Sequence, residues 1–232
     1  MHKEAETIHF GGLNLVLDTS GALWAPEHES LLVADLHFEK ASAFAARGVH
    51  LPPYDTRSTL MALTSAIRRF QPRRIISLGD SFHDDNARQR MDVECIAQIR
   101  ALTQAHEFVW ITGNHDETPP EDLGGKVVDE FQLDDVVLRH IPTEGLAFAP
   151  EISGHLHPVA TVARRGRRLR RRCFVSDGER MVMPAFGAFT GGLNVGSQAF
   201  EAIFPSRRFN AWLLGRDQVY RFASDKLLAA KR

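Results

Sequence analysis

Five short blocks of carboxylate, imidazole and amide side chains recur along the middle of the chain. They are Asp35-Leu36-His37, Gly79-Asp80, Gly113-Asn114-His115-Asp116, His140 and Gly154-His155-Leu156-His157. Oxygen and nitrogen donors of this kind suit hard or borderline divalent cations rather than a soft thiolate site. On an extended segment the side chains at i and i+2 point to one side, so each D-x-H or H-x-H pair can bind one ion. Because a carboxylate such as Asp80 can bridge two ions, the pattern predicts a two-metal centre.

Each block closes an apolar run that is typical of a β-strand. The runs cover residues 31–37, 73–80, 107–116, 135–142 and 149–158. Helical periodicity is found over residues 56–70, which Pro72 follows, and over residues 86–105. This alternation predicts an α/β protein with a βαβ core. Because ligands gather at the carboxyl ends of strands in such sheets, we expect the five blocks to meet in one place.

The rest of the chain is expected to be rich in β-structure and to belong to a single domain, residues 1–232. Residues 8–18 and 22–26 are predicted to form a hairpin around Thr19-Ser20-Gly21. A second, basic hairpin is predicted near residues 159–176, with its turn at Arg165-Gly166. Residues 181–195 are glycine-rich and loop-like, and residues 210–222 resemble another hairpin.

The composition is that of a globular protein without the overall positive charge that would attract polyanions. The 232 residues carry a formal net charge of −1, so any affinity for nucleic acid must be local. No run of apolar residues reaches the length of a membrane span, and the N-terminus has no apolar signal region. The two cysteines, Cys95 and Cys173, stand alone and read as reduced thiols, so we expect a cytoplasmic protein.

The order and spacing of the five blocks resemble the signature of the calcineurin-like metallophosphoesterases over residues 35–157. The resemblance implies a sandwich of two mixed β-sheets flanked by helices, with two metal ions at the strand ends. It assigns the first ion to Asp35, His37, Asp80 and His157, and the second to Asp80, Asn114, His140 and His155. It makes His115 the catalytic histidine. Asp116 either orients the site from outside the ligand set or is only a turn residue.

Further stretches resemble one branch of this superfamily. Gly79 to Asp84 is similar to the GD-x-F-H block of its DNA-repair nucleases, which makes His83 a catalytic candidate; otherwise it is a capping or surface histidine. Residues 22–41, 153–162 and 183–195 are similar to the bacterial ligase-associated DNA-damage-response endonucleases. That resemblance implies a functional association with an ATP-dependent DNA ligase and a helicase. Glu39 departs from it, because many relatives have glycine there.

A dense run of positive charge follows the last block. Seven arginines occupy the nine positions 164–172: Arg164, Arg165, Arg167, Arg168, Arg170, Arg171 and Arg172. A charge run is often only a solvated face, but arginine is well suited to phosphate and these residues have no acidic neighbours in the run. We interpret them as contacts to the backbone of DNA or RNA.

Together these observations predict a metal-dependent phosphodiesterase or endonuclease acting on nucleic acid, with a role in DNA repair. Two divalent ions are expected as cofactors, manganese first, with iron or zinc as alternatives. The alternative enzyme is a phosphoesterase that acts on small molecules such as nucleotides or nucleotide-sugars. A non-catalytic scaffold of the same fold is disfavoured, because no member of the ligand set is missing. No membrane partner is expected.

Overall fold

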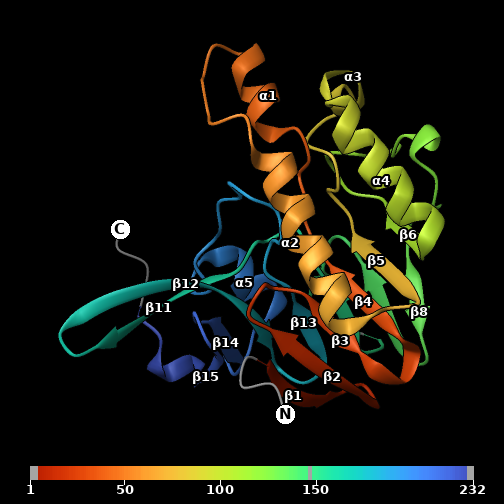
Figure 1. Ribbon diagram of the computed structural model, residues 1–232. Helices are drawn as coiled ribbons and strands as arrows, with labels where there is room; N and C mark the ends of the chain where they lie inside the picture. Colours follow the sequence, from red (N-terminus) through yellow and green to blue (C-terminus); the bar gives the residue numbers. More distant parts are fainter. Residues whose placement is uncertain (1–4, 146–147, 229–232) are drawn as a thin grey trace.

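The computed structural model describes residues 5–145 and 148–228, which form two packed β-sheets flanked by helices (Figure 1). The first sheet has the strand order β1-β2-β3-β4-β5-β6-β7. Its strands are β1 (Ala5–Phe10), β2 (Leu13–Asp18), β3 (Leu23–Ala25), β4 (Ser30–Val33), β5 (Arg74–Leu78), β6 (Glu107–Ile111) and β7 (Lys126–Val128). Strands β4 to β7 run parallel to one another, whereas β1 to β4 pair antiparallel. The predicted class, an α/β sandwich of two mixed sheets, is therefore confirmed.

The second sheet has the order β15-β14-β12-β13-β10-β9-β8, and β11 pairs with β12 beside this path. Its strands are β8 (Phe131–Leu133), β9 (Val136–Arg139), β10 (Glu151–Ser153), β11 (Val159–Arg164), β12 (Arg167–Ser176), β13 (Arg180–Val182), β14 (Asn210–Leu214) and β15 (Val219–Ala223). Strand β10 lies parallel to both β9 and β13. Strands β11 and β12 form an antiparallel hairpin that extends beyond the body of the protein in Figure 1.

Helices cover the outer faces of both sheets. They are α1 (Lys40–Ala46), α2 (Asp55–Phe70), α3 (Ala87–Arg90), α4 (Val93–Ala105) and α5 (Gln198–Ile203), with short 3-10 turns at Pro26–His28, Glu121–Leu123 and Ser224–Lys226. In Figure 1, α2 and α4 lie over the first sheet and α5 lies against the second. Among the described residues, no helix has both the length and the apolar character needed to cross a bilayer.

Strand alternation builds the core in layers. Leu32 and Ile76 are buried between the two sheets, whereas their neighbours Leu31 and Ile75 are buried against α2 and α4. A third cluster, which includes Phe200 of α5, fills the outer face of the second sheet. Because β4, β5 and β6 are covered on both faces, their sequences are continuous apolar runs, as parallel strands usually are. Their ends are thereby held in fixed register for the polar residues that follow.

Two predicted elements are divided in the structure. Residues 8–18 are not one strand, because the chain reverses at Gly11-Gly12, both of which have positive φ, so that β1 and β2 form a hairpin before the expected turn. The predicted helix over residues 86–105 breaks into α3 and α4. Asp92 causes the restart, since its carboxylate accepts a hydrogen bond from the Glu94 N–H and caps α4.

Candidate active site

The five blocks converge at the carboxyl ends of β4, β5, β6, β9 and β10. Among the described residues, five of the predicted metal ligands adopt positive φ although none is glycine: Asp35, His37, Asp80, His155 and His157. Left-handed backbone is unfavourable for such residues and tends to collect at functional sites. The strand ends therefore turn sharply and bring these side chains toward a common centre.

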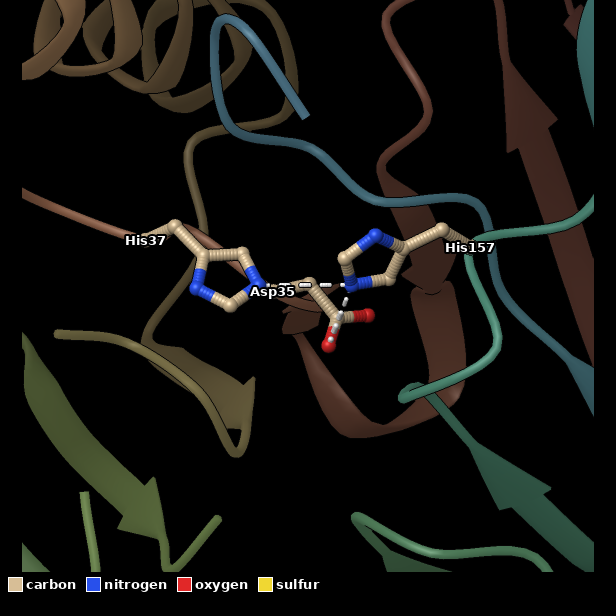
Figure 2. Close-up of side chains that lie close together, drawn as sticks. All are labelled: Asp35, His37 and His157. Carbon is tan, nitrogen blue, oxygen red and sulfur yellow. Dashed lines mark hydrogen bonds and ion pairs between the residues drawn. The ribbon is translucent and has the colours of Figure 1, made fainter. Parts of the chain in front are cut away.

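The first group consists of Asp35, His37 and His157, whose ligand atoms all lie within 4.8 Å of one another. Figure 2 shows the three side chains facing each other, with His157 Nε2 3.2 Å from Asp35 Oδ1 and 3.3 Å from His37 Nε2. Asp35 is fully buried, and both its oxygens accept a hydrogen bond from the His155 N–H. Burial lowers the pKa of His37 to about 2, so its imidazole is neutral, the form that binds metal.

The second group consists of Asp80, His140 and His155, again within 4.8 Å of one another. His140 Nε2 lies 3.3 Å from Asp80 Oδ1, 3.2 Å from His155 Nδ1 and 3.0 Å from the Asn114 side-chain oxygen. His140 Nδ1 donates to the Leu78 carbonyl at 3.0 Å, which fixes the ring and leaves Nε2 for a ligand. All predicted ligands therefore come together, Asn114 included, although their assignment as ligands remains a prediction.

Asp80 connects the two groups. Its Oδ1 faces His140, while its Oδ2 lies 3.7 Å from His37 Nε2 in the first group. Burial alone would raise the pKa of Asp80, but His140 and the His115 N–H outweigh that effect and hold the pKa below its ordinary range. Asp80 is thus a carboxylate in the position expected of a bridge between two ions.

The charges of the second group favour a cation at His140 Nε2. Burial lowers the pKa of His140, but the hydrogen bond to Asp80 and the charges of Asp35 and Asp80 prevail and raise it to about 9. A divalent ion held at this position would meet the same negative charges. The buried oxygen and nitrogen donors, with pairs of imidazole nitrogens facing each other at 3.2–3.3 Å, therefore fit two metal ions.

Glycines make this close approach feasible. A Cβ on Gly79 would lie 2.4 Å from the His140 ring, and one on Gly113 would lie 2.2 Å from the Asp80 nitrogen. A Cβ on Gly154 would lie 2.7 Å from Asp35 Oδ2. The three blocks that contain these glycines thus need them, because a residue of another block occupies the space that a side chain would fill.

The predicted catalytic residues lie beside the metal ligands. His115 is exposed, its ring is stacked 5.3 Å from that of His83, and its Nδ1 donates to the His83 carbonyl at 3.0 Å. This contact leaves His115 Nε2 as the atom that can exchange a proton. His83 is buried, and burial together with Lys40 and His115 lowers its pKa to about 4. His83 is thus a neutral imidazole that stacks on the His115 ring and accepts the His115 Nδ1–H at its main-chain carbonyl.

Asp116 orients the chain after Asp80. Its carboxylate is buried, and Oδ2 accepts hydrogen bonds from the Ser81 and Phe82 N–H groups at 2.8 and 3.1 Å. Burial raises the pKa of Asp116 to about 7, against the effect of these two hydrogen bonds. Of the two interpretations left open by the sequence, the contacts favour orientation of the site over a simple turn.

The structure closely resembles that of a known nuclease. It matches the crystal structure of Pseudomonas putida nuclease MPE with a TM-score of 0.72 and 32% identity, over 94% of this chain and 100% of that one. This chain belongs to the metallophosphoesterase family. As a metallophosphoesterase it is a hydrolase of phosphoric esters, and the two ligand groups are its candidate dinuclear centre.

Two further solved structures match this metallophosphoesterase more weakly. YfcE, a phosphoesterase from E. coli, matches 84% of this chain and 98% of its own with 13% identity and a TM-score of 0.42. Protein AQ665 of unknown function from Aquifex aeolicus matches 59% of this chain and 81% of its own with 16% identity and a TM-score of 0.39. At these TM-scores neither likeness carries an argument. No family model and no curated protein matches the sequence.

The arginine run of this metallophosphoesterase lies on the β11–β12 hairpin. Six of the seven arginines are exposed, whereas Arg172 is partly buried and donates to the carbonyls of Ala185 and Ser20 at 2.6 and 3.4 Å. Arg170 donates to the Gly192 carbonyl at 2.8 Å, and a Cβ on Gly192 would lie 2.5 Å from the His157 carbonyl. The base of the hairpin therefore adjoins a predicted metal ligand.

A lysine near the metallophosphoesterase centre was not expected from the sequence. Lys40 opens α1 three residues after His37 and is partly buried. Burial lowers its pKa, while Asp55, Asp80 and Asp35 act in the opposite direction. The only signal for it in the sequence is its position three residues after the D-x-H block. Glu39, also unassigned, is buried and accepts hydrogen bonds from the hydroxyls of Ser42 and Thr56.

Proposed function

We propose that this metallophosphoesterase is a nuclease that hydrolyses phosphodiester bonds of DNA or RNA. The observation that carries the proposal is the position of the arginine hairpin, whose base lies against the segment that touches His157. Exposed guanidinium groups on β11 and β12 can follow a phosphate backbone that leaves the metal centre. The match to a nuclease over the whole of that chain supports the same substrate class.

The residues of the candidate site would have different roles in hydrolysis. Asp35, His37 and His157 would hold one ion, and His140, His155 and Asn114 the other, with Asp80 between them. Two ions held in this way supply Lewis-acid activation of the phosphodiester and of the attacking water. His115, oriented by the His83 carbonyl, presents Nε2 to exchange a proton with the leaving oxygen. Asp116 holds the main chain after Asp80 so that the bridging carboxylate keeps its orientation.

Manganese is the metal we propose, with iron and zinc as alternatives. The donors are carboxylate, imidazole and amide groups, a mixture that suits borderline divalent ions. The two cysteines are buried and are not among either ligand group. The proposal extends to a cytoplasmic role in DNA repair beside an ATP-dependent DNA ligase and a helicase, which rests on the family resemblance of the sequence.

The test compares two substrates with two variants. Arg164, Arg167 and Arg168 lie toward the end of the hairpin, and replacing all three with serine should weaken binding to any oligonucleotide sequence. The slope of log affinity against log salt should flatten by about 0.7 per lost contact on single strands. A control variant removes the same charge elsewhere, at the exposed residues Arg68, Arg208 and Arg216.

Hydrolysis of bis-p-nitrophenyl phosphate should be the same in both variants and the parent, since this substrate is too short to reach the hairpin. A hairpin variant that binds and cuts DNA and RNA as the parent does, with an unchanged salt slope, would show that the arginines do not grip the substrate. Failure of the parent to cut any oligonucleotide would overturn the nuclease proposal itself.

A further inference from the structure

Phe189 has an unusual backbone for an apolar residue. Its φ is +58°, and it is the only apolar side chain with positive φ among residues 5–145 and 148–228 apart from glycines. Left-handed backbone is strained for a bulky residue. The strain is not offset by full burial in the core, because 47% of Phe189 is exposed and it belongs to none of the three core clusters. A strained and exposed aromatic ring that does not serve the core points to a contact with a ligand.

The loop that carries Phe189 is firmly attached to the metal centre. In this anchored loop, residues 184–190, the N–H of Gly187 donates to the Asp35 carbonyl and that of Phe186 to the Ala34 carbonyl, at 3.1 and 2.8 Å. The Ala188 N–H donates to the Thr59 hydroxyl of α2 at 2.9 Å. A Cβ on Gly187 would lie only 2.1 Å from the Leu36 carbonyl. Phe189 is therefore held at a fixed place two residues from the contact with a metal ligand.

Phe189 lines a hollow between the anchored loop and α2. The hollow has a volume of about 320 Å³, and its wall also includes Ser58 and Ala62 of α2, Thr190, and Arg172 of β12. Its size is at the small end for ligand sites in proteins. The Arg172 guanidinium is fixed by its bonds to the carbonyls of Ala185 and Ser20. The hollow thus combines an aromatic face, two hydroxyls and a fixed positive charge beside the hairpin.

We propose that this hollow receives a nucleobase of the substrate strand, stacked on the Phe189 ring, next to the scissile phosphate. The inference rests on the proposed nuclease function and adds a base-binding site to it. An aromatic face accepts any base, because every base offers a π-surface, and arginine planes stack in the same way. The Ser58 hydroxyl can meet the polar edge of the base, and Thr190 Oγ1 can accept a hydrogen bond from it while donating its own proton to the Gly187 carbonyl. Gly187 in the wall of the hollow donates to the carbonyl of the predicted ligand Asp35, and Arg172 in the same wall belongs to the arginine hairpin, so the hollow adjoins both.

Replacement of Phe189 by glycine separates a ligand contact from a structural role. Glycine adopts positive φ without strain, so F189G should keep or raise the melting temperature. Loss of one stacked base should raise the KM for oligo(dT) of twelve nucleotides about 5- to 150-fold. F189Y, which retains the ring, should restore the parent KM. Phe148→Ala, which removes a fully exposed ring from another loop, should change nothing.

Abasic oligonucleotides locate the base. In the parent, one abasic position near the cut should raise the KM by a similar factor, and F189G should show no further loss at that position. The manganese content of F189G and its kcat with bis-p-nitrophenyl phosphate should match the parent. The base site alone would be overturned if F189G had the parent KM on oligo(dT). It would also be overturned if the abasic change raised the KM of F189G by the same factor as it raises the KM of the parent. A parent that cuts no oligonucleotide would overturn the proposed nuclease function and the base site with it.

Discussion

Replacing Gly113 with alanine should disable the metal centre with only a modest loss of stability. The new Cβ would lie 2.2 Å from the Asp80 nitrogen, 2.3 Å from Asp80 Oδ1 and 2.6 Å from Asp116 Oδ1. Since real Cβ atoms keep at least 3.0 Å from such neighbours, Asp80 must retreat by about 0.8 Å. A misplacement near 1 Å at a reacting site costs about 10²-fold in rate, and we expect that loss in kcat.

The stability cost follows from the same overlap. Overpacking costs about 1–3 kcal/mol, which corresponds to a fall in melting temperature of about 2–12 °C for a protein of this size. The assays are hydrolysis of bis-p-nitrophenyl phosphate with manganese, metal content and thermal unfolding. Gly191→Ala is the matched control, because Gly191 also lacks positive φ but has nothing within 4 Å of its Cβ position. A G113A protein that keeps the parent kcat and metal content would refute the claim that Gly113 sets the position of Asp80.

Three further variants test the roles of individual side chains. Asp80→Ala should lose both bound metal and turnover, since it removes the carboxylate between the two groups; normal metal content would contradict this. His115→Ala should keep its metal and lose about 10²–10⁴ in turnover, the usual effect of a positioned acid or base, and near-normal turnover on a substrate with a poor leaving group would argue against this role. Asp116→Ala leaves the Ser81 and Phe82 N–H groups without an acceptor and should lower the free energy of unfolding by about 1–3 kcal/mol per group. Asp116→Asn keeps an acceptor oxygen and should lower it less. If both variants melted at the same temperature as the parent, the orienting role would be wrong.

The convergence of these side chains could be predicted from the sequence because each predicted ligand follows an apolar strand. The strands at 30–33, 74–78 and 107–111 are parallel neighbours, so their ends must meet at one edge of the sheet. The residue types and the apolar runs typical of strands are enough to predict that the side chains meet there. His140, in the shortest block, lies with the other ligands for the same reason, since β9 and β10 are parallel neighbours in the second sheet.

What the sequence could not show depends on contacts between distant segments. Asp116 can hold the main chain after Asp80 only because Ser81 and Phe82 approach its carboxylate from another strand end. Arg172 differs from its neighbours in the run because the loop at Ala185 passes beside it. The turn at Gly11-Gly12 was not predicted, because the apolar residues on both sides of it are typical of a single strand. In each case the local pattern is compatible with two structures, and packing decides between them.

The central claim is that Asp80 joins two ligand groups into a dinuclear centre. The most direct measurement is anomalous scattering from crystals soaked in manganese. Two peaks are expected, one among Asp35, His37 and His157 and the other among His140, His155 and Asn114, with Asp80 contacting both. A single peak, or none, would contradict it.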